Sequence, residues 1–310
     1  MTLWDISALV GPDSPIFPGD EPYAVSHTAT IGPGCPVNLT ALTLSPHIGA
    51  HVDAPIHFSP DGGDAASLPL EPFLGVCRVV HLIDDAPDRL ITRAELAAAL
   101  GIADMPDKAE EPSESDEPND SSESDESNEA DEPDQPNDSS ESDEPSEPEE
   151  PSESDEPSEA DEPSEPEEAD EPGQPNDSSE RAVANYGAAE DAARGASRRE
   201  ITGIPQRVLV RTRREALTLW RNDFAAFDAD ALRWLAALGV VLVGIDTPSV
   251  DPAESKDLPA HQALRDTGIV NLENLVLDHV PAGDYELIAL PLRLVGACAS
   301  PVRAVLRALP

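Results

Sequence analysis

A long internal tract without hydrophobic side chains limits what this chain can fold into. Between Met105 and Val183 the sequence contains no Val, Ile, Leu, Met, Phe, Tyr, Trp or Cys. Residues 110–180 hold 33 of the 63 acidic residues and 12 of the 33 prolines, and they contain no Lys or Arg. Such a tract cannot bury enough apolar surface to offset the conformational entropy that folding removes. We therefore predict that residues 105–200 form a disordered, acidic, low-complexity insert.

The insert also repeats itself. The nine residues PNDSSESDE at 118–126 recur at 136–144. A folded repeat needs an apolar face to stack against its neighbour, and these units have none. Proline and like-charge repulsion should keep the tract extended, so we interpret it as a solvated spacer. Binding of divalent cations or of a partner is the alternative.

The rest of the chain, residues 1–104 and 201–310, numbers 214 residues and is long enough for one well-buried domain. The net charge of -44 excludes a nucleic-acid-binding surface, and no run of apolar residues is long enough to span a membrane. We expect no secretory signal, because MTLWDISALVGPD lacks a basic start before an apolar stretch. Three widely spaced cysteines suggest a packing role and no disulfide framework. A soluble cytoplasmic protein is therefore expected.

The local patterns of these two segments predict a strand-rich α/β domain. Residues 37–45 (VNLTALTLS) alternate apolar and polar side chains, as a half-buried strand does. Helices are predicted at 92–100, which opens with a capping box, and at 228–238. Further strands are predicted from β-rich runs at 77–82, 207–212, 240–245 and 286–294. The insert would then lie in a surface connection between a helix and a strand.

One short motif carries most of the candidate chemistry. Residues 47–57 read HIGAHVDAPIH and contain three of the seven histidines. A glycine and a proline inside the motif argue against a regular helix, so a turn that leads into extended chain fits better. In extended chain His51 and Asp53, two residues apart, point to the same side. Imidazole and carboxylate together suit Zn²⁺, Mn²⁺ or Fe²⁺, so the motif predicts a metal site.

This motif resembles the HxGTHxDxPxH signature of the cyclase-like metal hydrolases, with Ala50 where many members have Thr. The chain is also similar to the bacterial kynurenine formamidase (arylformamidase) branch of that family. The similar segments are LWDIS at 3–7, PIFPGD at 15–20, LTLSPHIGAHVDAP at 42–55, GIDTPSVDPAESKDLPAH at 244–261 and the C-terminal run from residue 275 to 309. The resemblance implies a swivelling β/β/α cyclase-like single domain, and it omits residues from about 103 to 201.

Carried over residue by residue, the resemblance implies a site with two zinc ions. Three of the ligands would hold the first zinc, His261 would bind the second, and two carboxylates would be shared between them. The implied ligands are His47, His51, Asp53, His261 and Glu273, with Asp53 and Glu273 as the shared pair. The resemblance makes His57 the catalytic proton donor and acceptor. Phe17 would contact the substrate ring, at a position where many relatives have Trp.

The implied function is that of a kynurenine formamidase, which hydrolyses N-formyl-L-kynurenine to L-kynurenine and formate in tryptophan degradation by a binuclear zinc-hydroxide mechanism. The resemblance also implies a homodimer. One alternative is a related amide or ester hydrolase that is similar to the isatin hydrolases. The other is an acidic interaction or cation-binding protein in which residues 110–180 are the functional element. We expect no nucleic-acid partner and no membrane partner.

Overall fold

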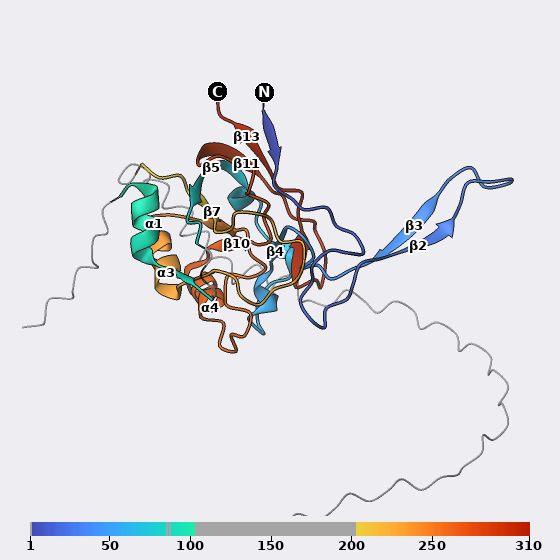
Figure 1. Ribbon diagram of the computed structural model, residues 1–310. Helices are drawn as coiled ribbons and strands as arrows, with labels where there is room; N and C mark the ends of the chain where they lie inside the picture. Colours follow the sequence, from blue (N-terminus) through green and yellow to red (C-terminus); the bar gives the residue numbers. More distant parts are fainter. Residues whose placement is uncertain (1, 85, 87, 103–202) are drawn as a thin grey trace, which may run out of the picture. The chain divides into compact units, whose positions relative to one another are not determined.

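The computed structural model describes residues 2–84, 86, 88–102 and 203–310 (Figure 1). These described residues fall in one compact unit. The insert predicted at 105–200 lies outside the described residues, so its predicted disorder stays a prediction. Among the helices of the described part, none is long and apolar enough to cross a membrane.

A mixed sheet of seven strands forms the centre of the described part. Its first four strands pair antiparallel and its last four pair parallel, so that β5 joins the two halves. Parallel neighbours need long crossover connections, and helices supply them here. The strand order is β1 (Leu3–Asp5), β13 (Val305–Ala308), β11 (Gly283–Ile288), β5 (Leu74–His81), β7 (Arg207–Arg211), β9 (Leu242–Ile245) and β10 (Val270–Leu272).

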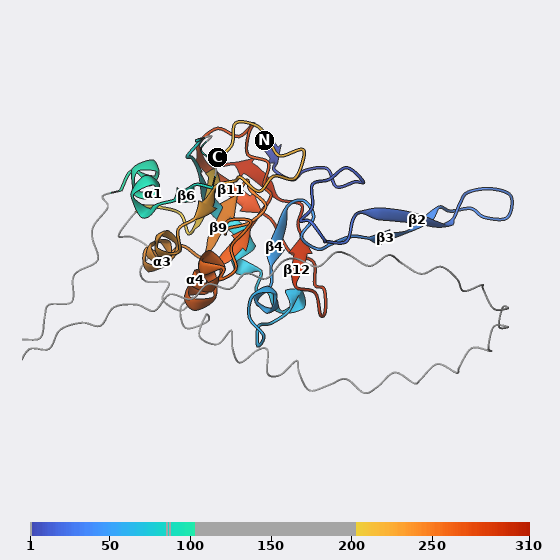
Figure 2. The ribbon, with the colours of Figure 1, turned by 60° about the horizontal axis from the view of Figure 1, so that its bottom comes forward.

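One face of the sheet is covered by helices α1 (Arg93–Leu100), α3 (Ala229–Ala237) and α4 (Pro259–Thr267), as Figures 1 and 2 show. Successive residues of a strand point to opposite faces. In β7, Val208 accordingly packs in the cluster with the helices, whereas Leu209 packs in the cluster on the other face. Strands β7 and β9 are therefore buried on both faces, as the continuous apolar run at 240–245 predicts for β9.

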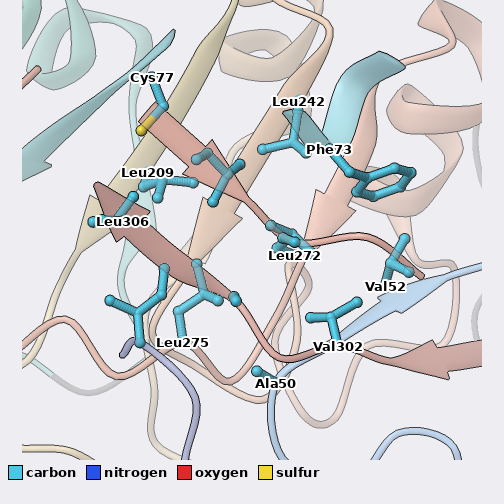
Figure 3. Close-up of a cluster of buried hydrophobic side chains, with 14 of the residues drawn as sticks. Ala50, Val52, Phe73, Cys77, Leu209, Leu242, Leu272, Leu275, Val302 and Leu306 are labelled. Carbon is cyan, nitrogen blue, oxygen red and sulfur yellow. The ribbon is translucent and has the colours of Figure 1, made fainter. Parts of the chain in front are cut away.

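The core on the opposite face lies under a second, smaller pair of strands. Strand β4 (His51–Asp53) pairs antiparallel with β12 (Ala299–Pro301). Val52 of β4 is fully buried in the same cluster as Leu272 of β10, and both are labelled in Figure 3. Because side chains alternate along β4, the burial of Val52 in this core turns its two polar neighbours the other way.

Most of the local predictions are confirmed. The side chain of Thr92 accepts from the backbone N–H of Glu95, and the side chain of Glu95 accepts from the backbone N–H of Thr92. Gly101 ends α1 in the left-handed conformation. Asp228 caps α3 in the same way, by accepting from the backbone N–H of Asp230. The short strands β6 (Leu90–Ile91) and β8 (Ala226–Phe227) pair with each other. The connection that contains the insert runs from the end of α1 to the start of β7, as predicted.

Two strand predictions are wrong in part. The strand predicted at 286–294 ends at Ile288, before Pro291, which has no backbone N–H to donate to a neighbouring strand. Strand β3 (Leu39–Thr43) is present but is exposed along its whole length, where half-burial was predicted. It pairs with β2 (Ala24–Ala29) in a hairpin that projects from the rest of the described part (Figures 1 and 2).

Candidate metal centre

In the HIGAHVDAPIH segment, a turn followed by a short strand sets the direction in which the histidine and aspartate side chains point. Gly49 has a left-handed φ of 65°, and a Cβ there would lie 2.7 Å from a methyl carbon of Val10, so this turn requires glycine. His51 Nδ1 donates to the carbonyl oxygen of Gly49 over 2.9 Å, which leaves Nε2 free for a ligand on the other side of the ring. Strand β4 follows directly, so the predicted turn and extended chain are confirmed.

The structure brings the five predicted metal ligands together around Asp53. Its Oδ1 lies 3.0 Å from His47 Nδ1 and 3.6 Å from His51 Nε2. Its Oδ2 lies 3.3 Å from His261 Nε2. Glu273 places one oxygen 3.3 Å from His51 Nε2 and the other 3.8 Å from His261 Nε2. Each of the two carboxylates therefore reaches histidines on two sides, which suits ligands that are shared between two cations.

Two buried atoms show that these residues fit a metal ion. Among the described residues, neither His51 Nε2 nor Asp53 Oδ1 has a hydrogen-bond partner. Buried polar atoms without a partner are rare in folded proteins, because their desolvation is costly. An imidazole nitrogen and a carboxylate oxygen that face each other are the ligands that zinc and similar divalent ions take. The unpartnered atoms thus fit a site that could hold a metal ion.

The charges of the cluster also favour a positive ion. Burial opposes the protonation of His51, but Glu273 and Asp53 outweigh it and raise the pKa of His51 to about 9. Burial likewise opposes the protonation of His261, whose pKa Asp251 and Asp53 raise to about 10. Burial disfavours the charged form of Asp53, yet the adjacent His261 and His47 hold its pKa well below the usual range. Without metal the site takes up protons, and a cation would replace them.

Asp251, which was not predicted as a site residue, fixes the position of His261. Its Oδ2 accepts from Nδ1 of the His261 ring over 2.7 Å and from the His261 backbone over 2.9 Å. Its Oδ1 accepts from the backbone of Ala260 over 2.8 Å. These bonds close the first turn of α4, where Leu258 provides no side-chain cap. The signal for Asp251 in the sequence was an acidic residue upstream of a helix that begins with a proline.

Asn271 was also missed, and it orients the two carboxylates. Its Nδ2 donates to Asp53 Oδ2 over 2.6 Å and to Glu273 Oε1 over 3.0 Å. Asn271 lies on β10, and Glu273 follows the strand directly, two residues after Asn271, so both side chains point to the same side of the extended chain. That spacing was visible in the sequence, but its meaning depends on the position of Asp53, which is distant in the chain.

His57 lies at the exposed edge of the cluster, at the end of a short 3-10 turn (Pro55–His57). The centroid of its ring is 4.4 Å from that of His47 and 5.8 Å from that of His261. Desolvation lowers the pKa of His57 below its ordinary value, although the charge of Asp53 opposes the shift. The ring is therefore neutral at neutral pH and can accept a proton. Its catalytic role stays a prediction.

The prediction that the cysteines only pack is wrong for Cys298. Its Sγ lies 3.3 Å from His47 Nε2, at the edge of the metal centre. Cys77 is buried in the core, as predicted, and all three cysteines are free in the described part. The cause of the error is the pairing of β12 with β4, which places residues separated by almost the whole chain side by side.

Phe17, predicted to contact the substrate ring, is half exposed and packs edge-on against Trp220, with ring centroids 5.2 Å apart. The backbone N–H of Asp20 donates to the Phe17 carbonyl over 3.0 Å, which closes a turn. The Asp20 carboxylate accepts from Ser45 Oγ over 2.8 Å, and Ser45 Oγ accepts from the backbone of His47. The Phe17 loop is thus tied to the metal-centre segment, while its contact with substrate stays a prediction.

The fold, together with a buried cluster of histidines and carboxylates, defines a metal-dependent hydrolase. A solved structure described as a potential metal-dependent hydrolase with cyclase activity has a TM-score of 0.57 and 19% identity, and the match covers 100% of this chain and 99% of that chain. An isatin hydrolase bound to the product analogue thioisatinate has a TM-score of 0.54 and 16% identity, with 98% and 91% covered. These likenesses confirm the predicted strand-rich cyclase-like α/β fold.

The sequence comparisons narrow the class to one family. Residues 4–109 match the family model described as putative cyclase. The chain is 40% identical to the kynurenine formamidase of Paracidovorax citrulli (strain AAC00-1) over 306 residues, which cover 98% of this chain and 96% of that protein. It is 38% identical to the kynurenine formamidase of Delftia acidovorans (strain DSM 14801 / SPH-1), with 99% and 98% covered. The chain therefore belongs to the cyclase family and, within it, to the group of the kynurenine formamidases.

Proposed function

We propose that this chain is a kynurenine formamidase, which hydrolyses N-formyl-L-kynurenine to L-kynurenine and formate in tryptophan degradation. The observation that carries the proposal is a buried cluster of three histidines and two carboxylates with His57 at its edge. It occurs in a chain that is 40% identical to a kynurenine formamidase over nearly its full length. A formamide is a stable amide, so its cleavage needs both an activated nucleophile and protonation of the departing nitrogen.

We infer that the cluster holds two zinc ions. His47, His51 and Asp53 would hold the first, His261 would hold the second, and Asp53 and Glu273 would be shared. When bound, zinc polarises a carbonyl oxygen and lowers the pKa of a coordinated water towards neutrality. The distances of each carboxylate to histidines on two sides support the sharing.

The chain's own residues supply the proton transfers and the aromatic contact. His57, neutral at neutral pH, accepts a proton as the nucleophile forms and returns it to the departing aniline nitrogen. A positioned histidine of this kind contributes about 10²–10⁴-fold to the rate. Phe17 offers a flat apolar surface to the aromatic ring of the substrate.

A formamidase assay on the full chain, before and after exhaustive chelation, tests the proposal. We expect chelation to abolish hydrolysis of N-formyl-L-kynurenine and added zinc to restore it. His57→Ala should lower turnover by about 10²–10⁴-fold while retaining its bound metal. Full activity after chelation, or unchanged turnover in His57→Ala, would contradict the scheme.

A related hydrolase of the isatin type is the second candidate, because isatin hydrolases share the fold. Turnover of N-formyl-L-kynurenine and of isatin, measured side by side, separates the two functions. The acidic cation-binding alternative predicts instead that activity and calcium binding both depend on residues 105–200. The cytoplasm stays the expected compartment.

We also propose that the chain forms a homodimer through the β2–β3 hairpin. Val25 and Leu42 lie opposite each other in the hairpin and are 42% and 58% exposed. Apolar pairs on a projecting hairpin are typical of protein–protein contacts. Light scattering should find a dimer for the native chain and a monomer for Leu42→Glu. Thr43→Glu, on the opposite face of the same strand, is the control. A monomeric native chain would contradict the proposal.

A further inference from the structure

A second group of metal-binding side chains lies at the edge of the metal centre. The atoms of His47, His57 and Cys298 that can bind a metal lie within 4.8 Å of one another. Cys298 Sγ is 3.3 Å from His47 Nε2, and the centroids of the two histidine rings are 4.4 Å apart. His57 is exposed and Cys298 is partly exposed, so this group can be reached from solvent.

The backbone holds the three residues in place. The carbonyl oxygen of Cys298 accepts from the backbone N–H of Ala54 over 2.9 Å, and Ala299 lies opposite Asp53 in the pairing of β12 with β4. His57 follows β4 after three residues, in a 3-10 turn. All three candidate ligands are therefore carried by one pair of strands and its flanks.

The donor atoms of this group differ from those of the metal centre. They are two imidazole nitrogens and one sulfur, with no carboxylate, and thiolates select zinc and softer cations. Zinc–nitrogen bonds of about 2.0–2.1 Å and zinc–sulfur bonds of about 2.3 Å put two ligands of one tetrahedral zinc roughly 3.5 Å apart. The 3.3 Å between Cys298 Sγ and His47 Nε2 is close to that separation.

His47 borders both sites through its two ring nitrogens. Nδ1 faces Asp53 at 3.0 Å, and Nε2 faces Cys298. We propose that His47, His57 and Cys298 form a separate site for a thiophilic divalent cation, such as zinc in excess or cadmium, and that a cation bound there inhibits the enzyme. Because Nδ1 of His47 would hold the first zinc, binding at Nε2 releases the Nε2 proton of His47 to solvent together with the thiol proton of Cys298. The cation also occupies the lone pair of His57, so His57 no longer carries protons. The inhibition rests on the proposed function, whereas the binding does not.

Cadmium titration of the zinc-loaded full chain tests the binding directly through the ultraviolet thiolate-to-cadmium charge-transfer band. We expect the band in the native chain and in Cys35→Ser, and its loss in Cys298→Ser. Cys35 is the matched control because it is the other partly exposed cysteine, whereas Cys77 is buried. A band that persists in Cys298→Ser, or that disappears in Cys35→Ser, would overturn the site.

If Cys298→Ser does not fold, a second variant tests cadmium binding at the proposed site. His57→Asn removes one of the three ligands and keeps the thiol, so we expect the band with cadmium affinity lowered by roughly tenfold or more. Unchanged cadmium affinity in a folded His57→Asn protein would also overturn the site.

Zinc-dependent activity tests the regulation. We expect zinc beyond the amount that loads the metal centre to inhibit the native chain. In Cys298→Ser the zinc concentration for half-inhibition, relative to the uninhibited activity of that variant, should rise by roughly tenfold or more. Equal inhibition in both proteins would overturn the regulation. A cadmium band in a chain without formamidase activity would support the site and contradict the proposed function.

Discussion

At the scale of single residues, Asp53 joins parts of the chain that are far apart in sequence. Its two oxygens face His47 and His51 on one side and His261 on the other. Asn271 adds a hydrogen bond that fixes the plane of the carboxylate. Without Asp53, three histidines would share a mostly buried space in which Glu273 and Asp251 are the remaining carboxylates beside them. We therefore regard Asp53 as the residue on which assembly of the metal centre depends most.

Asp251 gives the first prediction at this scale. Asp251→Asn removes the charged acceptor that orients the His261 ring, and such partners of metal ligands typically account for about 10–100-fold in metal affinity. We expect a loss of that size in competition titrations against a chromophoric chelator. Asp266→Asn is the control: it changes an exposed acidic residue on α4, the helix that carries His261, and should keep the native metal affinity. Native affinity in folded Asp251→Asn would show that the bond does not position the ligand.

The buried histidines predict how the stability of the metal-free protein depends on pH. The pKa values of His51 and His261 are raised from the ordinary 6.5 to about 9 and about 10. Between pH 6.5 and these raised values, the folded state therefore binds more protons than the unfolded state. This stabilisation is complete below about pH 6.5 and is lost as the pH rises through about 9 to 10.

Melting temperatures of chelated protein between about pH 6 and pH 10 check this prediction. They should fall as the pH rises, and zinc-loaded protein should lack this loss, because metal binding requires unprotonated histidines. A melting temperature of the metal-free protein that increases over the range would contradict the assigned pKa shifts.

The residues that spacing alone identifies stand together in one short motif, whereas His261, Glu273 and Phe17 were predicted only from the family resemblance. His47, His51 and Asp53 stand together, and their spacing alone indicates a metal site. Asp251 and Cys298 were missed because each depends on one contact made in three dimensions, with His261 and His47 respectively. Neither contact leaves a periodic or local signal.

At the scale of elements, the signals that begin and end helix α1 were read correctly, whereas the burial of strand β3 was not. Helix α1 follows from a capping box and a glycine stop, both of which act within a few residues. The alternation in β3 was read as half-burial, yet nothing in the described part of the chain covers the hairpin. Alternation reports that a strand has two unlike faces, whereas burial depends on a second layer that may come from anywhere in the fold.

Gly244 provides the prediction for an element. It lies within β9, and a Cβ there would stand 2.4 Å from a methyl carbon of Leu209 and 2.8 Å from one of Leu275, both buried. Overpacking a close-packed core typically costs about 1–3 kcal/mol, so Gly244→Ala should lower the free energy of unfolding by that amount. Urea denaturation measures the change. Gly11→Ala, at a glycine with open space around it, should be neutral, and equal effects of the two changes would count against the packing argument.

At the scale of the whole molecule, the predicted insert separates the two parts of the chain that build the metal centre. His47, His51 and Asp53 precede it, and His261 and Glu273 follow it. The described elements on either side, α1 and β7, belong to the same compact unit. The insert therefore interrupts the chain without interrupting any element that carries a ligand.

Removal of residues 105–200, with a short linker in their place, tests whether the insert is dispensable. We expect folding and formamidase activity to be retained, because the tract interrupts no matched motif and lacks apolar residues. Loop-closure entropy grows by about 0.6 kcal/mol per doubling of length, so shortening the connection from about 100 to about 10 residues should stabilise the fold by roughly 2 kcal/mol at most.

The values of kcat/KM and Tm for the two forms, at low and at physiological salt, check this prediction. Charges more than about 8 Å apart are screened at physiological salt. A difference between the two forms that appears only at low salt would therefore come from long-range attraction or repulsion by the acidic tract, whereas a difference at both salt concentrations would come from a role in folding. A loss of activity of more than about tenfold, equivalent to about 1.4 kcal/mol, would make the insert part of the working enzyme.

The positions of the candidate ligands in the chain also determine the order in which they are synthesised. About 200 residues lie between His57 and His261, and ribosomes add about 5–20 residues per second, so the first half of the site waits roughly 10–40 s for the second during synthesis. Through that interval β4 has neither of its neighbours, β12 and Glu273, both of which follow the insert in the chain. The growing chain therefore cannot bring the five candidate ligands together until Glu273 has been made, so a metal that needs all five is bound only after the insert has been synthesised.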